Sequence, residues 1–125
     1  MNMKTTLTCK TDSPSAQAVQ LCSVDDLIAD SGVCALINNQ QIALFWLPAL
    51  TPALYALGNY DPLGKASVLS RGMVGDLRGE PVVASPLYKQ HFSLRDGHCL
   101  EVPEVSVPVY RVELRDNQVF CYLPQ

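Results

Sequence analysis

The side chains of this chain that could bind metal or attack a substrate are few and scattered. No C-x-x-C pair occurs among its five cysteines, which are Cys9, Cys22, Cys34, Cys99 and Cys121. Zinc sites draw their ligands from closely spaced pairs, so this spacing favours reduced thiols. Cys99 and Cys121 lie within expected strands, and we expect both to pack in the core rather than to act as nucleophiles.

The two histidines, His91 and His98, flank the sequence Arg95-Asp96-Gly97. Asp-Gly is a strong hairpin signal, so the two arms should bring the histidines close together. We expect half-buried or exposed strand histidines, with no acidic or cysteine ligand at metal spacing. The sequence contains no glycine-rich phosphate loop, dinucleotide fingerprint or G-x-S-x-G elbow. It therefore predicts no catalytic residue and no metal site on this chain.

The elements that would position these side chains are short strands separated by turns. Val33–Ile37 and Gln41–Leu47 flank Asn38-Asn39-Gln40, and asparagine tolerates the backbone of a tight turn. A short helical turn capped by Ser23 or Asp25 should precede them. Further strands are expected at Ala53–Leu57, Met73–Gly75, Pro81–Ala84, His91–Leu94, His98–Glu101, Val109–Leu114 and Val119–Leu123. Tyr110, Val112 and Leu114 should share one face of their strand. Such regular turn signals predict an all-β antiparallel sandwich or small barrel.

The length and charge of the chain limit its organisation and its partners. Its 125 residues suit one domain, expected at 19–125, after a flexible polar tail at 1–18. The net charge is −3 and the basic residues are spread out, which argues against nucleic acid. The uncharged stretch between Asp30 and Asp61 contains prolines, and its most apolar part is shorter than a membrane span. We expect a buried strand, an apolar loop and a second strand there, no membrane partner, and a cytoplasmic location because no apolar leader is visible.

Two stretches resemble the cluster-binding loops of a Rieske iron–sulfur domain, which read approximately N-x-C-P-H-x-G and C-P-x-H-G-x-x-F-x-L-x-x-G. The corresponding stretches here are NYDPLGKASVLSRG (Asn59–Gly72) and SPLYKQHFSLRDG (Ser85–Gly97). The prolines, the Ser-x-Gly and the Phe-x-Leu-x-x-Gly agree. Cysteine and histidine hold the cluster in a Rieske domain, but the four equivalent positions here are Asp61, Leu63, Ser85 and Tyr88.

The chain thus resembles a Rieske domain that lacks its cluster ligands. In this respect it also resembles the small subunit of cytoplasmic NAD(P)H-dependent nitrite reductase, and the resemblance includes the segments VLSRG, VASPLYKQHFSL and GHCLE. In that family a large subunit carries FAD, a [4Fe–4S] cluster and sirohaem, and reduces nitrite to ammonium in nitrate assimilation. The resemblance implies a Rieske-like all-β fold with an inserted cluster-loop subdomain at about 59–98. It also implies the large subunit as partner and no cofactor on this chain, because Leu63 has no donor atom and Ser85 replaces a soft thiolate poorly.

Three expectations follow for these loops. Leu63 and Tyr88 should point toward each other and fill the space that a cluster would take. The loop surface with Lys65, Arg71, Lys89 and Gln90 is either a docking site for the large subunit or a solvated charged rim. A second docking candidate is the apolar loop Trp46–Leu50, where we expect Trp46 to be buried and Leu50 exposed.

Two other functions remain open from the residues alone. One is a free-standing Rieske-like interaction domain of another redox complex. The other is an electron-carrying [2Fe–2S] protein, against which the four substituted ligand positions argue strongly. Oligomeric state and the choice between NADH and NADPH are not encoded in any recognisable pattern.

Overall fold

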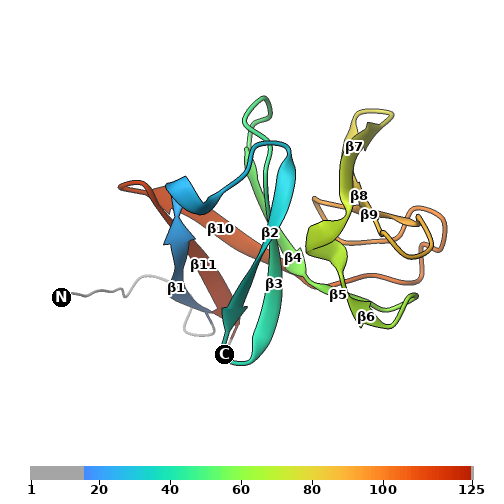
Figure 1. Cartoon of the computed structure of the whole chain (residues 1–125), viewed down its shortest axis with the longest axis horizontal. Helices are drawn as coiled ribbons and strands as arrows, with labels where there is room; N and C mark the ends of the chain where they lie inside the picture. The colour runs from blue at the N-terminus through green and yellow to red at the C-terminus, as the bar shows by residue number, and fades with distance from the viewer. Residues whose placement is uncertain (1–15, 125) are drawn as a thin grey trace.

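The computed structural model describes residues 16–124, whose regular elements are all strands or short 3₁₀ turns. The larger sheet is antiparallel throughout and curls into a half-barrel (Figure 1). Its six strands follow the spatial order β1 (Ala16–Ser23), β11 (Gln118–Pro124), β10 (Val109–Arg115), β4 (Leu54–Gly58), β3 (Gln40–Trp46) and β2 (Ser31–Ile37).

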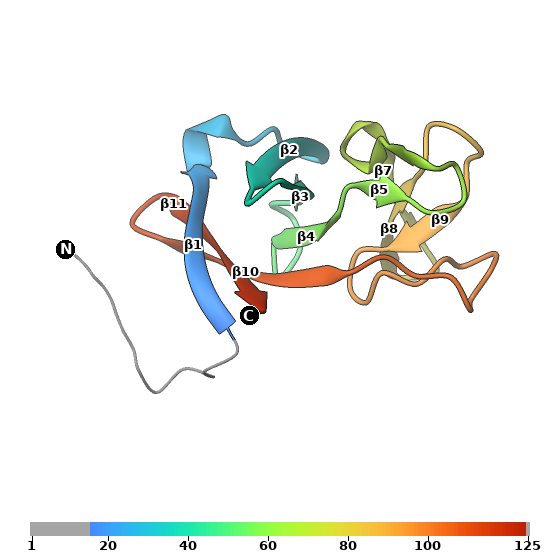
Figure 2. The same ribbon diagram turned by 90° about the horizontal axis from the view of Figure 1, so that it is seen from below.

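Between β4 and β10 the chain leaves this sheet and builds a smaller unit, which lies beside the half-barrel in Figure 2. This unit has a three-stranded and a two-stranded sheet: β7 (Met73–Leu77), β8 (Glu80–Ala84) and β9 (His91–Ser93), and β5 (Tyr60–Asp61) with β6 (Ala66–Ser67). Two 3₁₀ turns complete the fold, η2 (Val24–Asp26) and η3 (Leu69–Arg71). The predicted all-β fold with an inserted loop unit is confirmed. The unit continues past residue 98, since bridges join Phe92 to Cys99 and His98 to Ser106.

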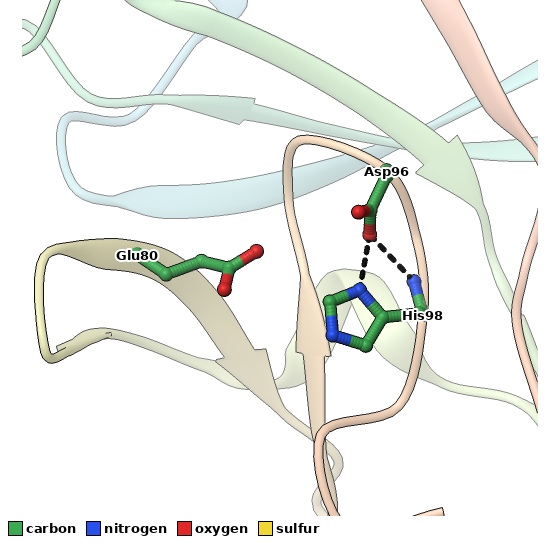
Figure 3. Close-up of side chains that lie close together, drawn as sticks. All are labelled: Glu80, Asp96 and His98. Atoms are coloured by element: carbon green, nitrogen blue, oxygen red, sulfur yellow. Dashed lines mark hydrogen bonds and ion pairs between the residues drawn. The ribbon is translucent and has the colours of Figure 1, made fainter. Parts of the chain in front are cut away.

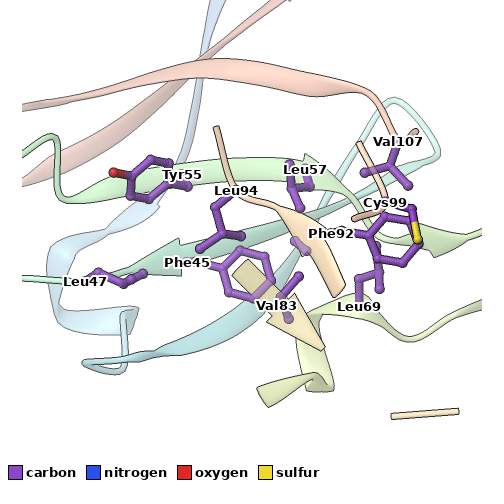
Figure 4. Packing of buried hydrophobic residues seen from close by; sticks show 11 residues of the cluster. Phe45, Leu47, Tyr55, Leu57, Leu69, Val83, Phe92, Leu94, Cys99 and Val107 are labelled. Atoms are coloured by element: carbon purple, nitrogen blue, oxygen red, sulfur yellow. The ribbon is translucent and has the colours of Figure 1, made fainter. Parts of the chain in front are cut away.

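Strand β3 lies between two hydrophobic cores and is buried on both faces, which explains its uninterrupted apolar sequence. Ile42 and Leu44 pack inside the half-barrel with Val119 and Cys121. Ala43 and Phe45 face the opposite way, into the core that the half-barrel shares with the smaller unit (Figure 4). The labelled residues of this shared core are Phe45, Leu47, Tyr55, Leu57, Leu69, Val83, Phe92, Leu94, Cys99 and Val107.

The hairpin turns follow the sequence signals. Asn38 and Asn39 both have left-handed backbones (φ 50° and 65°), as expected for a two-residue hairpin turn, and the β10–β11 turn repeats this at Asp116 and Asn117. Gly97 also has a positive φ of 83°, and a Cβ there would lie 2.2 Å from the Val107 carbonyl oxygen. Ser23 caps η2 through a capping box, as expected, but η2 is a three-residue 3₁₀ turn that begins one residue before the expected helical turn and ends earlier.

Three local expectations differ from the structure. Strand β1 begins at Ala16, inside the segment expected to be a tail, and the rest of that segment (1–15) lies outside the described residues. Leu114 is 49% exposed because it approaches the end of β10, while Tyr110 and Val112 pack on the core as predicted. Residues 98–101 form isolated bridges rather than a strand. None of the helical turns within 16–124 is long and apolar enough to cross a membrane.

Thiol labelling tests this placement of the cysteines in a Cys9→Ser background, which removes the thiol outside the described residues. Cys34 is exposed, whereas Cys99 and Cys121 are fully buried. Burial raises the pKa of Cys99 and raises the pKa of Cys121 to about 11, which suppresses the reactive thiolate. Mass spectrometry after iodoacetamide treatment at pH 8 should therefore find Cys34 modified first, and all four thiols modified in guanidinium. Equal native rates for Cys121 and Cys34 would contradict the fold.

Candidate functional site

The two Rieske-like loops are joined by a buried hydrogen bond between the side chains of Asp61 and Ser85. Ser85 Oγ donates to Asp61 Oδ2 at 2.5 Å, and neither residue is exposed to solvent. The other carboxylate oxygen, Oδ1, accepts the backbone N–H groups of Leu63 (2.9 Å) and Gly64 (3.0 Å). The carboxylate thus has three donors, as a buried charged group requires. A side-chain bond therefore links the two loops at positions 61 and 85, which the sequence resemblance matched with cluster ligands.

The two loops have matching backbone geometry around this bond. Lys65 donates its N–H to the carbonyl of Asp61 (2.7 Å), and Lys89 donates to the carbonyl of Ser85 (3.0 Å). Both lysines adopt left-handed backbones, with φ of 58° and 66°. Each loop therefore makes one closed turn after its bonded residue and places a lysine at the end of that turn.

Two glycines allow the loops to approach each other and the smaller sheet. A Cβ on Gly64 would lie 2.5 Å from Cδ1 of Leu87 in the second loop, and 2.8 Å from Asp61 Oδ2. A Cβ on Gly72 would lie 2.4 Å from the Ala84 carbonyl oxygen. Real Cβ atoms do not approach other atoms this closely, so Gly72 is required by a backbone contact, whereas a side chain at position 64 would force the Leu87 and Asp61 side chains to move. The glycine of the Ser-x-Gly stretch, Gly72, is thus explained by packing within this chain.

Asn59 anchors the first loop to the half-barrel. Its side-chain amide donates to Gln41 Oε1 (2.9 Å) and to the Ser67 carbonyl (3.1 Å), and its Oδ1 accepts the N–H of Ser70 (2.7 Å). The residue is only 2% exposed, so these bonds satisfy a buried amide. The Asn59 side chain therefore fixes both the beginning and the end of the first loop.

The expected contact between Leu63 and Tyr88 does not form, because only Leu63 turns toward the core. Leu63 is half-buried and packs against the shared core, but Tyr88 is 64% exposed. The space between the loops is instead closed by the Asp61–Ser85 bond and by Leu87 against Gly64. The side chains of Asp61 and Ser85 satisfy each other's hydrogen-bonding groups. The Tyr88 phenol is therefore not needed between the loops and lies in solvent.

The four residues at the Rieske ligand positions do not fit an iron–sulfur cluster. Leu63 has no donor atom, and Tyr88 lies at the surface. Asp61 and Ser85 are committed to each other and to backbone donors. Hard oxygen atoms are also poor replacements for the thiolates that such clusters bind.

The residues predicted to dock a partner lie in two regions, around the two loops and in the apolar segment that starts at the last residue of β3. Lys65, Arg71 and Lys89 are exposed around the loops, whereas Gln90 is half-buried. Among the described residues, Gln90 Oε1 is a buried oxygen without a hydrogen-bond partner. Elsewhere, Trp46 packs partly buried on the half-barrel core and Leu50 is 38% exposed, as expected for the apolar loop.

The expectation that the histidines have no acidic neighbour is wrong. His91 Nδ1 lies 2.6 Å from Glu101 Oε2, and His98 Nδ1 is hydrogen-bonded to Asp96. Glu80 also approaches His98, and one potential metal-ligand atom from each of Glu80, Asp96 and His98 lies within 4.8 Å of the others (Figure 3). The Asp96 hydrogen bond raises the pKa of His98, and the His98 N–H lowers the pKa of Asp96. Sequence spacing could have found Asp96, two residues away, but Glu80 comes from another strand. Both histidines are half-buried, as predicted.

Removing the Ser85 hydroxyl tests the bond between the loops. Ser85→Ala leaves Asp61 Oδ2 buried without its donor, so the free energy of unfolding should fall by about 1–3 kcal/mol. Ser67→Ala is the matched control, because Ser67 is exposed and only its carbonyl is bonded. Chemical denaturation measures both. Equal stability of the two variants would show that the bond does not hold the loops.

Comparison with known proteins agrees with this geometry. The family model for the Rieske-like [2Fe-2S] domain matches residues 17–121. The nitrite reductase (NADH) small subunit of Escherichia coli K12 is 41% identical over 104 residues, which cover 83% of this chain and 95% of that protein. The solution NMR structure of the E. coli protein NirD superimposes with a TM-score of 0.78 at 39% identity, covering 86% of this chain and 96% of that one.

A further relative is a much longer protein. The nitrite reductase [NAD(P)H] large subunit of Klebsiella oxytoca is 39% identical over 107 residues, which cover 86% of this chain but only 11% of that polypeptide. A segment similar to this chain is thus part of a protein named a large subunit. From the family model, the identity and the coverage together, the chain belongs to the family of nitrite reductase (NADH) small subunits, which have a Rieske-like domain.

Proposed function

We propose that this chain is the cluster-free small subunit of a cytoplasmic NAD(P)H-dependent nitrite reductase in nitrate assimilation. In this proposal a large subunit with FAD, a [4Fe–4S] cluster and sirohaem reduces nitrite to ammonium, and this chain supports it by docking. The observation that carries the proposal is the Asp61–Ser85 bond, which joins the loops at two ligand positions without metal. Free thiols, including the exposed Cys34, suit a reducing compartment.

The relative from Klebsiella oxytoca supports the partnership. Where a segment similar to this chain lies within a large-subunit polypeptide, the two parts are held together covalently. A separate small subunit must reach the same proximity by binding, and its affinity then depends on a complementary surface.

The loop surface is the proposed docking site, because its exposed charges are mostly positive. Residues 59–72 and 85–97 contain four exposed cations, Lys65, Arg71, Lys89 and Arg95, against one exposed acid, Asp96, because Asp61 is buried. The whole chain has a net charge of −3, so positive charge is concentrated here against the average. Leu87 (45% exposed) and Tyr88 (64%) add apolar surface between these cations. This combination suits an acidic, partly apolar partner surface.

Iron uptake tests the cluster-free part of the proposal. After anaerobic incubation with ferrous iron and sulfide, followed by desalting, the chain should retain no stoichiometric iron and show no visible cluster absorption. A Rieske ferredoxin that binds its cluster serves as the positive control. Two irons per chain would instead favour the electron-carrying function.

Charge reversal tests docking at the loops. The double variant Lys89→Glu/Arg71→Glu should bind the large subunit of the same organism about tenfold more weakly, with a smaller dependence on salt, because rim charges steer association. Arg115→Glu is the control, since Arg115 lies at the β10–β11 turn, at the opposite end of the molecule in Figure 1. Unchanged binding by the double variant would place the interface elsewhere.

A further inference from the structure

Three side chains that can bind a metal ion lie together where β8 begins, at the opposite end of that strand from Ser85. Glu80, Asp96 and His98 each offer one ligand atom, and these atoms lie within 4.8 Å of one another. Figure 3 shows both carboxylates beside the His98 ring, approaching it from two sides. The function proposed above uses none of these three groups.

Pairing of β8 with β9 brings the three residues together. In this pairing Val82 lies opposite Ser93. Glu80 is two residues before Val82, so it lies beside the turn that follows β9. Asp96 and His98 belong to that turn. The group is therefore a product of strand register and not of sequence spacing.

The backbone of this turn is held at several points, which fixes the positions of the two ligands it carries. The Ser93 N–H donates to the His98 carbonyl at 2.9 Å, and the Gly97 N–H donates to the Ser93 carbonyl at 2.9 Å. A further bridge joins His98 to Ser106. Ligands on an ordered backbone lose little conformational freedom when they bind an ion.

The ligand groups keep bonding capacity that the described part of the chain does not use. The hydrogen bond from Asp96 reaches Nδ1 of His98, and no partner within residues 16–124 bonds Nε2. Glu80 forms no ion pair with a described residue, although Arg78 and Arg95 are close to the group in sequence. Among the described residues, the one counter-ion of these two carboxylates is thus a proton on His98.

Two carboxylate oxygens and one imidazole nitrogen form a ligand set of intermediate hardness. Mg²⁺ and Ca²⁺ take oxygen ligands, whereas imidazole favours first-row transition metals. Ligands about 2.1 Å from a tetrahedral ion lie about 3.4 Å apart. Atoms now within 4.8 Å of one another therefore need to close by at most about 1.4 Å, which partly exposed side chains can do by rotation. Three protein ligands also leave a position for water.

We propose that Glu80, Asp96 and His98 form a binding site for one divalent transition-metal ion, with Mn²⁺ and Zn²⁺ the best suited. The ion ties the start of β8 to the turn after β9. Because its ligands are partly exposed, the ion exchanges with solvent and is removed by desalting, unlike a retained two-iron cluster. The site needs no partner chain, so its test stands apart from that of the proposed function.

Titration with MnCl₂ tests the site directly, since cysteine thiolates prefer softer metals than Mn²⁺. The paramagnetic ion should first broaden the amide NMR signals of Glu80, Gly97 and His98. The electron paramagnetic resonance signal of free Mn²⁺ should show one saturable site per chain. His98→Gln and Glu80→Gln should each weaken binding at least tenfold, because even residues behind the ligands of a metal site contribute this much.

Two matched variants control for other histidines and other acids. His91→Gln removes a histidine of similar exposure whose acidic partner is Glu101, and Asp76→Asn removes an exposed carboxylate from the β7–β8 hairpin. Both should leave Mn²⁺ affinity unchanged, and circular dichroism should show every variant folded. Weakening by the controls as large as that by His98→Gln, or by His98→Gln without Glu80→Gln, would overturn the inference. Absence of saturable binding at millimolar Mn²⁺ would also overturn it and leave the group holding only a proton.

Discussion

The arrangement of the smaller unit depends on how two loops are held together at their tips. In this chain a single hydroxyl–carboxylate bond between Ser85 and Asp61 joins them, inside a region from which water is excluded. A hydrogen bond to a charged group contributes only about 1.5–3 kcal/mol. The loops must therefore be largely ordered by their surroundings, and the bond adds the last constraint.

Those surroundings are visible in the packing. Asn59 fixes the first loop to the half-barrel, Gly64 admits Leu87 of the second loop, and Gly72 lies against the Ala84 carbonyl. Behind them, the shared core joins Phe45 of β3 to Phe92 of β9. Because the frame is held by contacts of these kinds, a bonded polar pair at Asp61 and Ser85 is compatible with a Rieske-like fold. The loops present a surface whose exposed charges are mostly positive.

The sequence predicted the strands and turns well wherever local chemistry determines them. Asn38-Asn39 and Asp96-Gly97 form the expected turns, and the uncharged stretch before Asp61 is the doubly buried strand β3 with its loop and β4. Strand β1 was missed because its apolar residues alternate with polar ones directly after a Ser- and Thr-rich segment.

The candidate site was harder to predict from the sequence. The resemblance indicated the four ligand positions, but which of them would meet depended on burial: the short pair Asp61–Ser85 is enclosed, and Tyr88 is not. Glu80 lies beside His98 only because segments distant in sequence come together in the fold, which no local pattern encodes.

In the function we propose, the chain needs no redox centre of its own and binds a partner that carries the chemistry. The most direct measurement is NADH-dependent and NADPH-dependent nitrite reduction by the purified large subunit, titrated with this chain prepared free of iron. The account predicts that activity or its lifetime rises and saturates near one chain per large subunit, with no iron added. A large subunit that is equally active and stable without this chain, or a stimulation that appears only after iron and sulfide are supplied, would contradict it.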